Sequence, residues 1–297
     1  VDIAIKRSYR KALEIIYSSI RDYSEKDAEK TCARIFLGTI YIGGDDGLIL
    51  TPSWLALPFA HFIAEEFTKQ LGLARSLSMG VAVGSARMNI WSLVDCSTSL
   101  MELAKRFLRG KMKEDPGVSA ICFFSFDSGS PSGEVVKHML ERFSPRLKNY
   151  EKSSVLGLSM QPYLLSPSNS ELWKVCSPLI FEPEDDSTTY EHAFKIAYLA
   201  TSTHSEDKEA KNVKEWLNRI RNIVIDSWNI VRDSNYWKEM LLVYIRHQRI
   251  RFEEEKDTTT EAYKRFDDLI RYTYAEHKAI PLVDILMVCK LLKGGVQ

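Results

Sequence analysis

The sequence predicts an α+β fold, a sheet covered by helices, followed by a helical bundle. Short apolar segments alternate with longer segments whose apolar residues recur every three or four positions, through about residue 165. Two of the short segments are joined by a turn rich in glycine and aspartate. Beyond residue 171 the pattern is helical almost throughout. Strands that alternate with helices around a hairpin are typical of a sheet-and-helix sandwich.

The first segments predict a helix and then the hairpin. Residues 5–21 place Ala12, Ile16 and Ile20 near one face of a helix. The charged stretch 22–30 is expected to interrupt this pattern, and the apolar run 34–42 predicts the first hairpin strand. The second strand leaves through Leu48, Ile49 and Leu50. A fold of this kind also needs a strand before its first helix, for which the sequence offers only Val1-Asp2-Ile3. The sequence begins at Val1 rather than Met, and its first twenty residues already follow a helical pattern, so we expect a piece of a longer protein.

The next segments continue the alternation. Ser53 is expected to cap a helix that stops at Gly72. The later elements are predicted as a strand over 76–84, a helix over 91–109, a strand over 118–126, a helix over 134–143 and a strand within 155–165. This order predicts a sheet with helices on one face, of ferredoxin-like or palm type, over residues 1–170.

Residues 171–297 are predicted to form an all-α bundle. Five helices are expected, over 190–200, 208–232, 236–254, 261–277 and 281–292. The basic cluster of Arg246, His247, Arg249 and Arg251 is consistent with contact to RNA or a neighbouring subunit. Such a cluster is more often a solvated face that the following glutamates balance.

Composition indicates a globular protein without a dominant charge. Forty basic and forty acidic residues cancel among the 297 residues, so no overall field indicates a nucleic acid or a membrane as partner. The five cysteines are widely separated, which suits reduced thiols in the cytoplasm. The longest apolar stretch, residues 54–64, is too short to cross a bilayer, so no membrane association is expected.

The turn Gly43-Gly44-Asp45-Asp46 is the candidate site. Glycines allow a sharp reversal and a close approach of the backbone to a ligand. At a hairpin tip two adjacent carboxylates can converge, and such hard oxygen ligands suit Mg²⁺ or Mn²⁺ that carries nucleotide phosphates. The same four residues are also ordinary turn formers, so the motif alone leaves a simple turn open.

In this context, the first part of the chain resembles the second palm domain of the large subunit of type III CRISPR effector complexes. The matching features are Ile40-Tyr41-Ile42-Gly43-Gly44-Asp45-Asp46, the strand of residues 77–83, the helix end Glu102-Leu103-Ala104-Lys105, and Gln161-Pro162-Tyr163 before a helical domain. The resemblance is strong for residues 35–110 and looser beyond.

The resemblance implies an RNA-guided interference subunit that makes cyclic oligoadenylate from ATP. It implies that Asp45 and Asp46 bind the catalytic Mg²⁺ or Mn²⁺, that Gly43 and Gly44 shape the nucleotide site, and that Lys105 lies near the triphosphate. Other effector subunits, guide RNA and target RNA are the implied partners. The superfamily's further carboxylate on the first strand has no clear counterpart here, so the site of this chain is expected to be incomplete by itself.

Two other functions compete with this interpretation. A diguanylate cyclase shares the palm, but Gly47 and Leu48 follow the aspartates where that family has Glu and Phe, and Arg34-Ile35-Phe36-Leu37 lacks its Arg-x-x-Asp signature. A non-catalytic scaffold would use the palm to hold guide RNA and small subunits. Binding of metal and ATP separates a scaffold from an enzyme.

Overall fold

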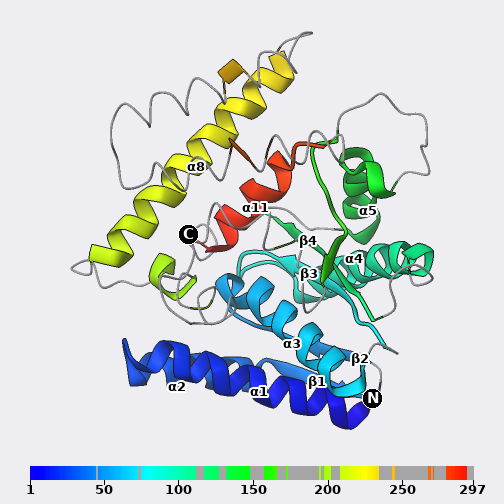
Figure 1. The fold of residues 1–297 in the computed structure, drawn as a ribbon, viewed down its shortest axis with the longest axis vertical. Coiled ribbons are helices and arrows are strands. Elements are labelled where there is room, and N and C mark those ends of the chain that lie inside the picture. Colours follow the sequence, from blue (N-terminus) through cyan, green and yellow to red (C-terminus); the bar gives the residue numbers. More distant parts are fainter. Residues whose placement is uncertain are drawn as a thin grey trace.

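The structure is a computed structural model that mixes helices with small sheets. It describes residues 1–44, 46–72, 75–111, 117–126, 132–147, 157–165, 172, 194, 197–201, 208–233, 243–244, 267–268, 270 and 279–292. The longer helices are α1 (Asp2–Arg21), α2 (Glu25–Leu37), α3 (Ala56–Leu71), α4 (Ile90–Lys111), α5 (Gly133–Phe143), α8 (Lys208–Asp233) and α11 (Leu282–Leu292). The strands are β1 (Thr39–Gly43), β2 (Asp46–Ile49), β3 (Ser78–Val83), β4 (Ser119–Ser125) and β5 (Tyr163–Leu165). Figure 1 shows their arrangement.

The strands form two separate sheets. β1 and β2 make the predicted hairpin, with Gly43 opposite Asp46. In the second sheet β3 pairs with β4 in parallel, and β4 pairs with β5 in the antiparallel direction. The predicted strands 76–84 and 118–126 are confirmed, whereas the segment predicted within 155–165 supplies only the three residues of β5.

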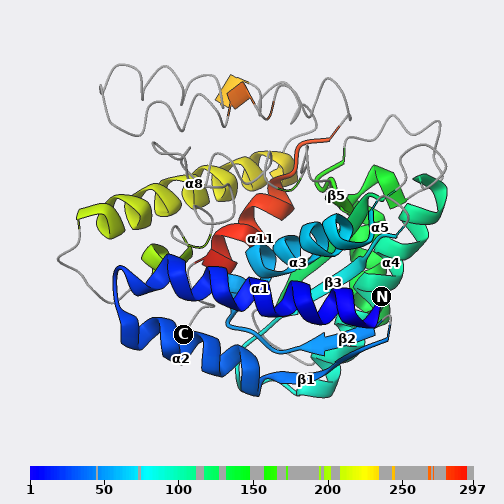
Figure 2. The same ribbon diagram turned by 60° about the horizontal axis from the view of Figure 1, so that its bottom comes forward.

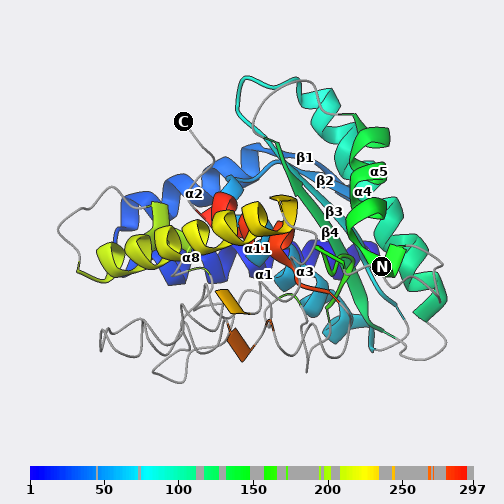
Figure 3. The same ribbon diagram turned by 90° about the horizontal axis from the view of Figure 1, so that it is seen from above.

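Helices cover both faces of the strands, so the prediction of helices on one face is wrong. In Figure 3, α4 and α5 lie on one side of the strands, and α1, α3 and α11 lie on the other. The reason lies in β4, whose residues Ser119–Phe124 are all buried without alternation. A strand buried on both faces needs cover from both sides.

The N-terminal region differs from the prediction because it holds two helices. Residues 22–30 do not interrupt the helical pattern for long: the Ser24 side chain accepts a hydrogen bond from the Asp27 N–H and starts α2. Ala28, Thr31 and Ile35 form the buried face of α2. Residues 34–37 are therefore helical, and the first strand begins only at Thr39. Figure 2 shows α1 and α2 beside the β1–β2 hairpin.

Glycines 38 and 72 end the two helices around the hairpin. A Cβ at Gly38 would lie 2.3 Å from the Leu50 carbonyl oxygen, so only glycine lets α2 pass this close to the end of β2. Gly72 follows α3 with a φ of 65°, which glycine adopts without strain, and the helix ends at the predicted position. Ser53 does not cap α3, because a short 3₁₀ turn, Ser53–Leu55, precedes the helix and makes no side-chain capping bond.

The C-terminal helices pack onto the first part of the chain. α8 and α11 confirm the predicted helices 208–232 and 281–292, and one buried cluster contains both Leu100 of α4 and Trp216 of α8. The predicted helices 236–254 and 261–277 lie outside the described residues, apart from helical residues 243–244, 267–268 and 270. The division into a palm over 1–170 and a bundle over 171–297 stays a prediction.

Candidate nucleotide site at the hairpin tip

The hairpin closes through the shortest common loop. Gly43 pairs with Asp46, so only two residues separate the paired positions in the sequence. Gly44 has a φ of 64°, which the first position of a two-residue hairpin loop requires and which glycine adopts without strain. A Cβ at Gly44 would meet nothing within 4 Å, so the turn is open to a ligand. Asp45 lies outside the described residues.

Asp46 stands exposed at the start of β2 and is held by two short-range hydrogen bonds. The Tyr41 hydroxyl donates to Asp46 Oδ2 at 3.0 Å, and the Gly47 N–H donates to Oδ1 at 2.8 Å. A tyrosine hydroxyl is protonated at neutral pH, and the bond to Asp46 raises the pKa of Tyr41 further. These bonds orient the carboxylate, which has about four acceptor positions and so keeps capacity for a further ligand.

A second carboxylate, Asp2, reaches the same turn. Its Oδ1 accepts the Gly44 N–H at 3.0 Å, and its Oδ2 accepts Lys6 Nζ at 2.9 Å. The bonds from Lys6 and Gly44 lower the pKa of Asp2. The sequence left residues 1–3 as a possible remnant of an opening strand. In the structure Asp2 lies in the first turn of α1 instead, and its bond to the hairpin could not be foreseen from spacing.

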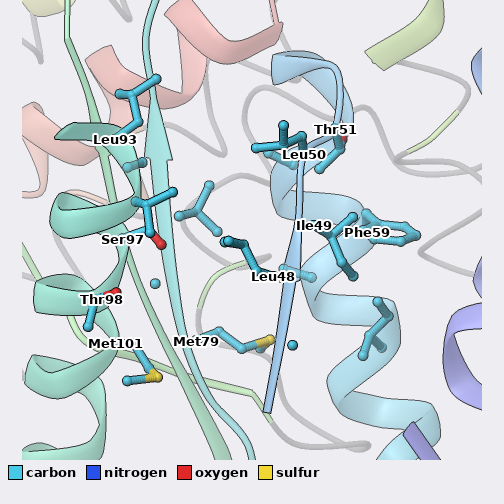
Figure 4. Close-up of a pocket in the computed structure, with 18 of the residues that line it drawn as sticks. Leu48, Ile49, Leu50, Thr51, Phe59, Met79, Leu93, Ser97, Thr98 and Met101 are labelled. Carbon is cyan, nitrogen blue, oxygen red and sulfur yellow. The ribbon is translucent and has the colours of Figure 1, made fainter. Parts of the chain in front are cut away.

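The hairpin tip and Lys105 line one cavity. This cavity of about 1240 Å³ is bounded by β2, β3, α3 and α4, and its lining includes Gly44, Asp46 and the exposed Lys105. Figure 4 shows Leu48 of β2 and Met79 of β3 on two sides of it, with Ser97, Thr98 and Met101 along α4. The structure thus brings together three of the predicted site residues. Gly43 lies next to them, opposite Asp46.

The chemistry of the tip fits a hard divalent cation. Asp46 offers carboxylate oxygens at an exposed turn, as Mg²⁺ and Mn²⁺ prefer. Among the described residues, no group of three or more His, Cys, Asp or Glu side chains is placed to hold a metal ion. Of the two predicted metal ligands, the structure describes Asp46, and Asp45, next to it in sequence, is its predicted partner.

Other candidate features add less. The basic cluster of Arg246, His247, Arg249 and Arg251 lies outside the described residues. No helix in the part of the chain that the structure describes is long and apolar enough to cross a membrane.

Comparison with known proteins supports the resemblance seen in the sequence. Residues 5–113 match the family model of the Cas10/Cmr2 second palm domain. The matched region runs from α1 to the end of α4 and includes the hairpin, β3 and Lys105. No curated protein matches the chain. Residues 5–113 are therefore a second palm domain of the Cas10/Cmr2 family, the large subunit of type III CRISPR complexes.

Proposed function

We propose that the hairpin tip binds ATP with Mg²⁺ or Mn²⁺, and that the palm joins adenylates into cyclic oligoadenylate within the assembled effector complex. The observation that carries this proposal is that Gly44 and Asp46 of the hairpin line one cavity together with Lys105 of α4, which is far from them in sequence. A carboxylate for a metal ion and an amine for phosphates are the two groups that nucleotidyl transfer needs.

Each residue has a part in this proposal. Asp45 and Asp46 hold the ion, and Gly43 and Gly44 let the phosphates approach the backbone of the turn. Tyr41 keeps Asp46 oriented through its hydroxyl. Lys105, on a flexible stem at the cavity wall, offsets the charge of the triphosphate.

The proposed reaction is an in-line displacement. A bound divalent ion would polarise the α-phosphate and stabilise the negative charge that develops there. The oxygen of a ribose hydroxyl forms a bond to the α-phosphorus, the bond to pyrophosphate breaks, and the hydroxyl proton passes to solvent. Closing the ring requires the same step once more, between the two ends of one oligoadenylate.

We also propose that other effector subunits, with guide and target RNA, control this reaction in the cytoplasm. Membership of a multi-subunit CRISPR complex follows from the family. A palm that serves only as a scaffold for guide RNA and small subunits would have no reason to bind metal or ATP.

Calorimetry with ATP and Mn²⁺ tests the proposal. The full chain is expected to bind ATP only with the metal, and Asp45→Ala/Asp46→Ala is expected to abolish this binding. Asp22→Ala removes an exposed carboxylate outside the cavity and should bind as the wild type does. Failure of the wild type to bind, or equal binding by the double variant, would contradict the proposal.

Lys105→Ala tests the phosphate contact separately. We expect the dissociation constant for ATP to rise about tenfold, which corresponds to about 1.4 kcal/mol. Lys26→Ala, an exposed lysine of α2 outside the cavity, should leave the affinity unchanged. An unchanged affinity in Lys105→Ala would remove this residue from the site.

A further inference from the structure

The outer side of α2 carries a row of three cations, which we call the basic row. Lys26, Lys30 and Arg34 follow one another at about one helical turn, and all three are exposed. They lie away from the buried face of α2, and none of them forms an ion pair among the described residues. Figure 2 shows α2 at the edge of the molecule, with α1 beside it. The three charges are therefore open to a partner.

The acidic residues of α2 face other elements. The Tyr17 hydroxyl of α1 donates to Glu25 at 3.4 Å, and the Tyr198 hydroxyl donates to Asp27 at 3.1 Å. Glu29 lies one turn after Glu25, on the same side of α2, where its charge acts on Tyr17. The acidic residues of this helix therefore do not pair with the basic row.

An apolar cluster adjoins the basic row at the end of α2. Phe36, Leu37 and Ile40 are 67%, 80% and 57% exposed. Leu50 is exposed too, and its Cβ would lie 3.1 Å from a Cβ at Gly38. Large apolar side chains that are exposed together mark an interaction site, whereas single ones are ordinary. We call Phe36, Leu37, Ile40 and Leu50 the apolar cluster.

A β-bulge accompanies the exposure of Ile40. The pairing with β2 shifts by one residue between Thr39 and Tyr41, so Ile40 is an extra residue in β1. A bulge interrupts the ladder and bends the strand, which makes its outer edge a poor template for another strand. A partner is therefore expected to pack against the side chains here and not to add a strand to β1.

We propose that this face of α2 binds an acidic amphipathic helix of another protein subunit. The partner's carboxylates pair with the basic row, and its apolar side chains cover the apolar cluster. Carboxylates spaced by three or four residues along a helix match the one-turn spacing of the basic row. The family places this chain in a multi-subunit complex, which provides such a partner.

Two other occupants fit this face less well. A second copy docked through the same face about a two-fold axis would bring two basic rows together, where like charges repel. A nucleic acid strand would neutralise the cations through its phosphates. It would leave Leu37 and Ile40 without an apolar partner. An acidic and partly apolar protein surface satisfies both parts of the face.

The affinity of the full chain for the remaining subunits tests this proposal, with no ATP or metal added. The probe is the effector complex assembled without this chain. Leu37→Ser/Ile40→Ser and Lys26→Glu/Lys30→Glu are each expected to raise the dissociation constant at least tenfold. The matched controls Leu37→Met/Ile40→Val and Lys26→Arg/Lys30→Arg keep the apolar character and the charge, and should bind as the wild type does. All four variants change exposed residues, so their Tm should equal that of the wild type.

Carbodiimide crosslinking identifies the partner, because it joins a lysine amine to a carboxylate that it contacts. In the assembled complex we expect crosslinks from Lys26 or Lys30 to aspartate or glutamate of another subunit, located by mass spectrometry. Hydrogen exchange in residues 26–40 should be at least tenfold slower in the complex than in the free chain.

Three outcomes would overturn the proposal. Unchanged affinity in both the serine and the glutamate variants would show that this face binds no subunit. Photocrosslinking of residues 26–40 to RNA, without crosslinks to a subunit, would identify a nucleic acid as the occupant. A dimer of the free chain that Leu37→Ser/Ile40→Ser dissociates would identify a second copy. Because no ATP is present, these outcomes do not depend on the proposed nucleotide binding.

Discussion

Two aspartates of this chain lie in opposite environments. Asp284 of α11 is fully buried, and its oxygens accept four hydrogen bonds, from Ser159 Oγ, the Met160 N–H, Gln161 Nε2 and the Tyr163 hydroxyl. Asp46 is exposed and accepts two, from Tyr41 and Gly47. The first carboxylate has no acceptor position left, whereas the second has about two.

This difference indicates that Asp284 is a structural carboxylate, whereas Asp46 is a candidate metal ligand. The Asp284 cluster fastens α11 to the segment 157–163, which also holds the Gln161-Pro162-Tyr163 motif. Burial raises the pKa of Asp284, although each of its four hydrogen bonds lowers it. Asp284 is buried and all its acceptor positions are used, so its role is to hold α11 against the segment 157–163 rather than to bind a ligand. Asp46, in contrast, can bind a cation without breaking the core.

The largest expected effect is the loss of stability in Asp284→Ala. Four buried donors lose their acceptor, and each unsatisfied donor costs about 1–3 kcal/mol before relaxation. We expect the free energy of unfolding to fall by about 3 kcal/mol or more, measured by urea denaturation. Asp46→Ala should change it by about 0.5 kcal/mol or less. A fall below about 1 kcal/mol in Asp284→Ala would show that the four bonds are not needed.

The second-largest expected effect is a pH dependence of stability that comes from Asp284. Because the pKa of Asp284 is raised above 3.8 in the folded state, the folded state binds this proton more tightly than the unfolded state. The stabilisation is complete below pH 3.8 and is lost as pH rises through the raised value, by at most about 1.4 kcal/mol per pH unit.

Urea midpoints of wild type and Asp284→Asn, measured from acid to neutral pH, check this dependence. The stability of the wild type relative to Asp284→Asn should decrease as pH rises. An increase over that range would mean that the hydrogen bonds hold the charged form and that its pKa is not raised.

Local sequence patterns predicted the elements in which the apolar residues are the buried ones. The hairpin, β3, α4 and α8 were found because turn residues and apolar periodicity mark them. The start of the hairpin was misplaced because Phe36 and Leu37 are apolar yet exposed at the end of α2, so hydrophobicity did not report burial there. Periodicity also cannot show that β4 is covered on both faces.

Partners far apart in sequence could not be predicted. The bond from Gly44 to Asp2 spans 42 residues, and the bonds of Asp284 span more than 120. Nothing in their local sequence marks either aspartate. At the site, Gly44, Asp46 and Lys105 could be chosen because of the resemblance to a palm, and the structure adds that they share a cavity.

The smallest expected effect concerns the hairpin tip. The bond to Asp46 raises the pKa of Tyr41, so Asp46→Asn should lower that pKa toward its ordinary value of 10. NMR of labelled tyrosine measures the titration, and Tyr41→Phe assigns the signal. Asp284→Asn should leave the Tyr41 titration unchanged. An unchanged titration in Asp46→Asn would mean that Tyr41 does not hold Asp46 in solution. Since the bond is exposed, its loss should change the free energy of unfolding by about 0.5 kcal/mol or less, and the tip can rearrange around a ligand without loss of the fold.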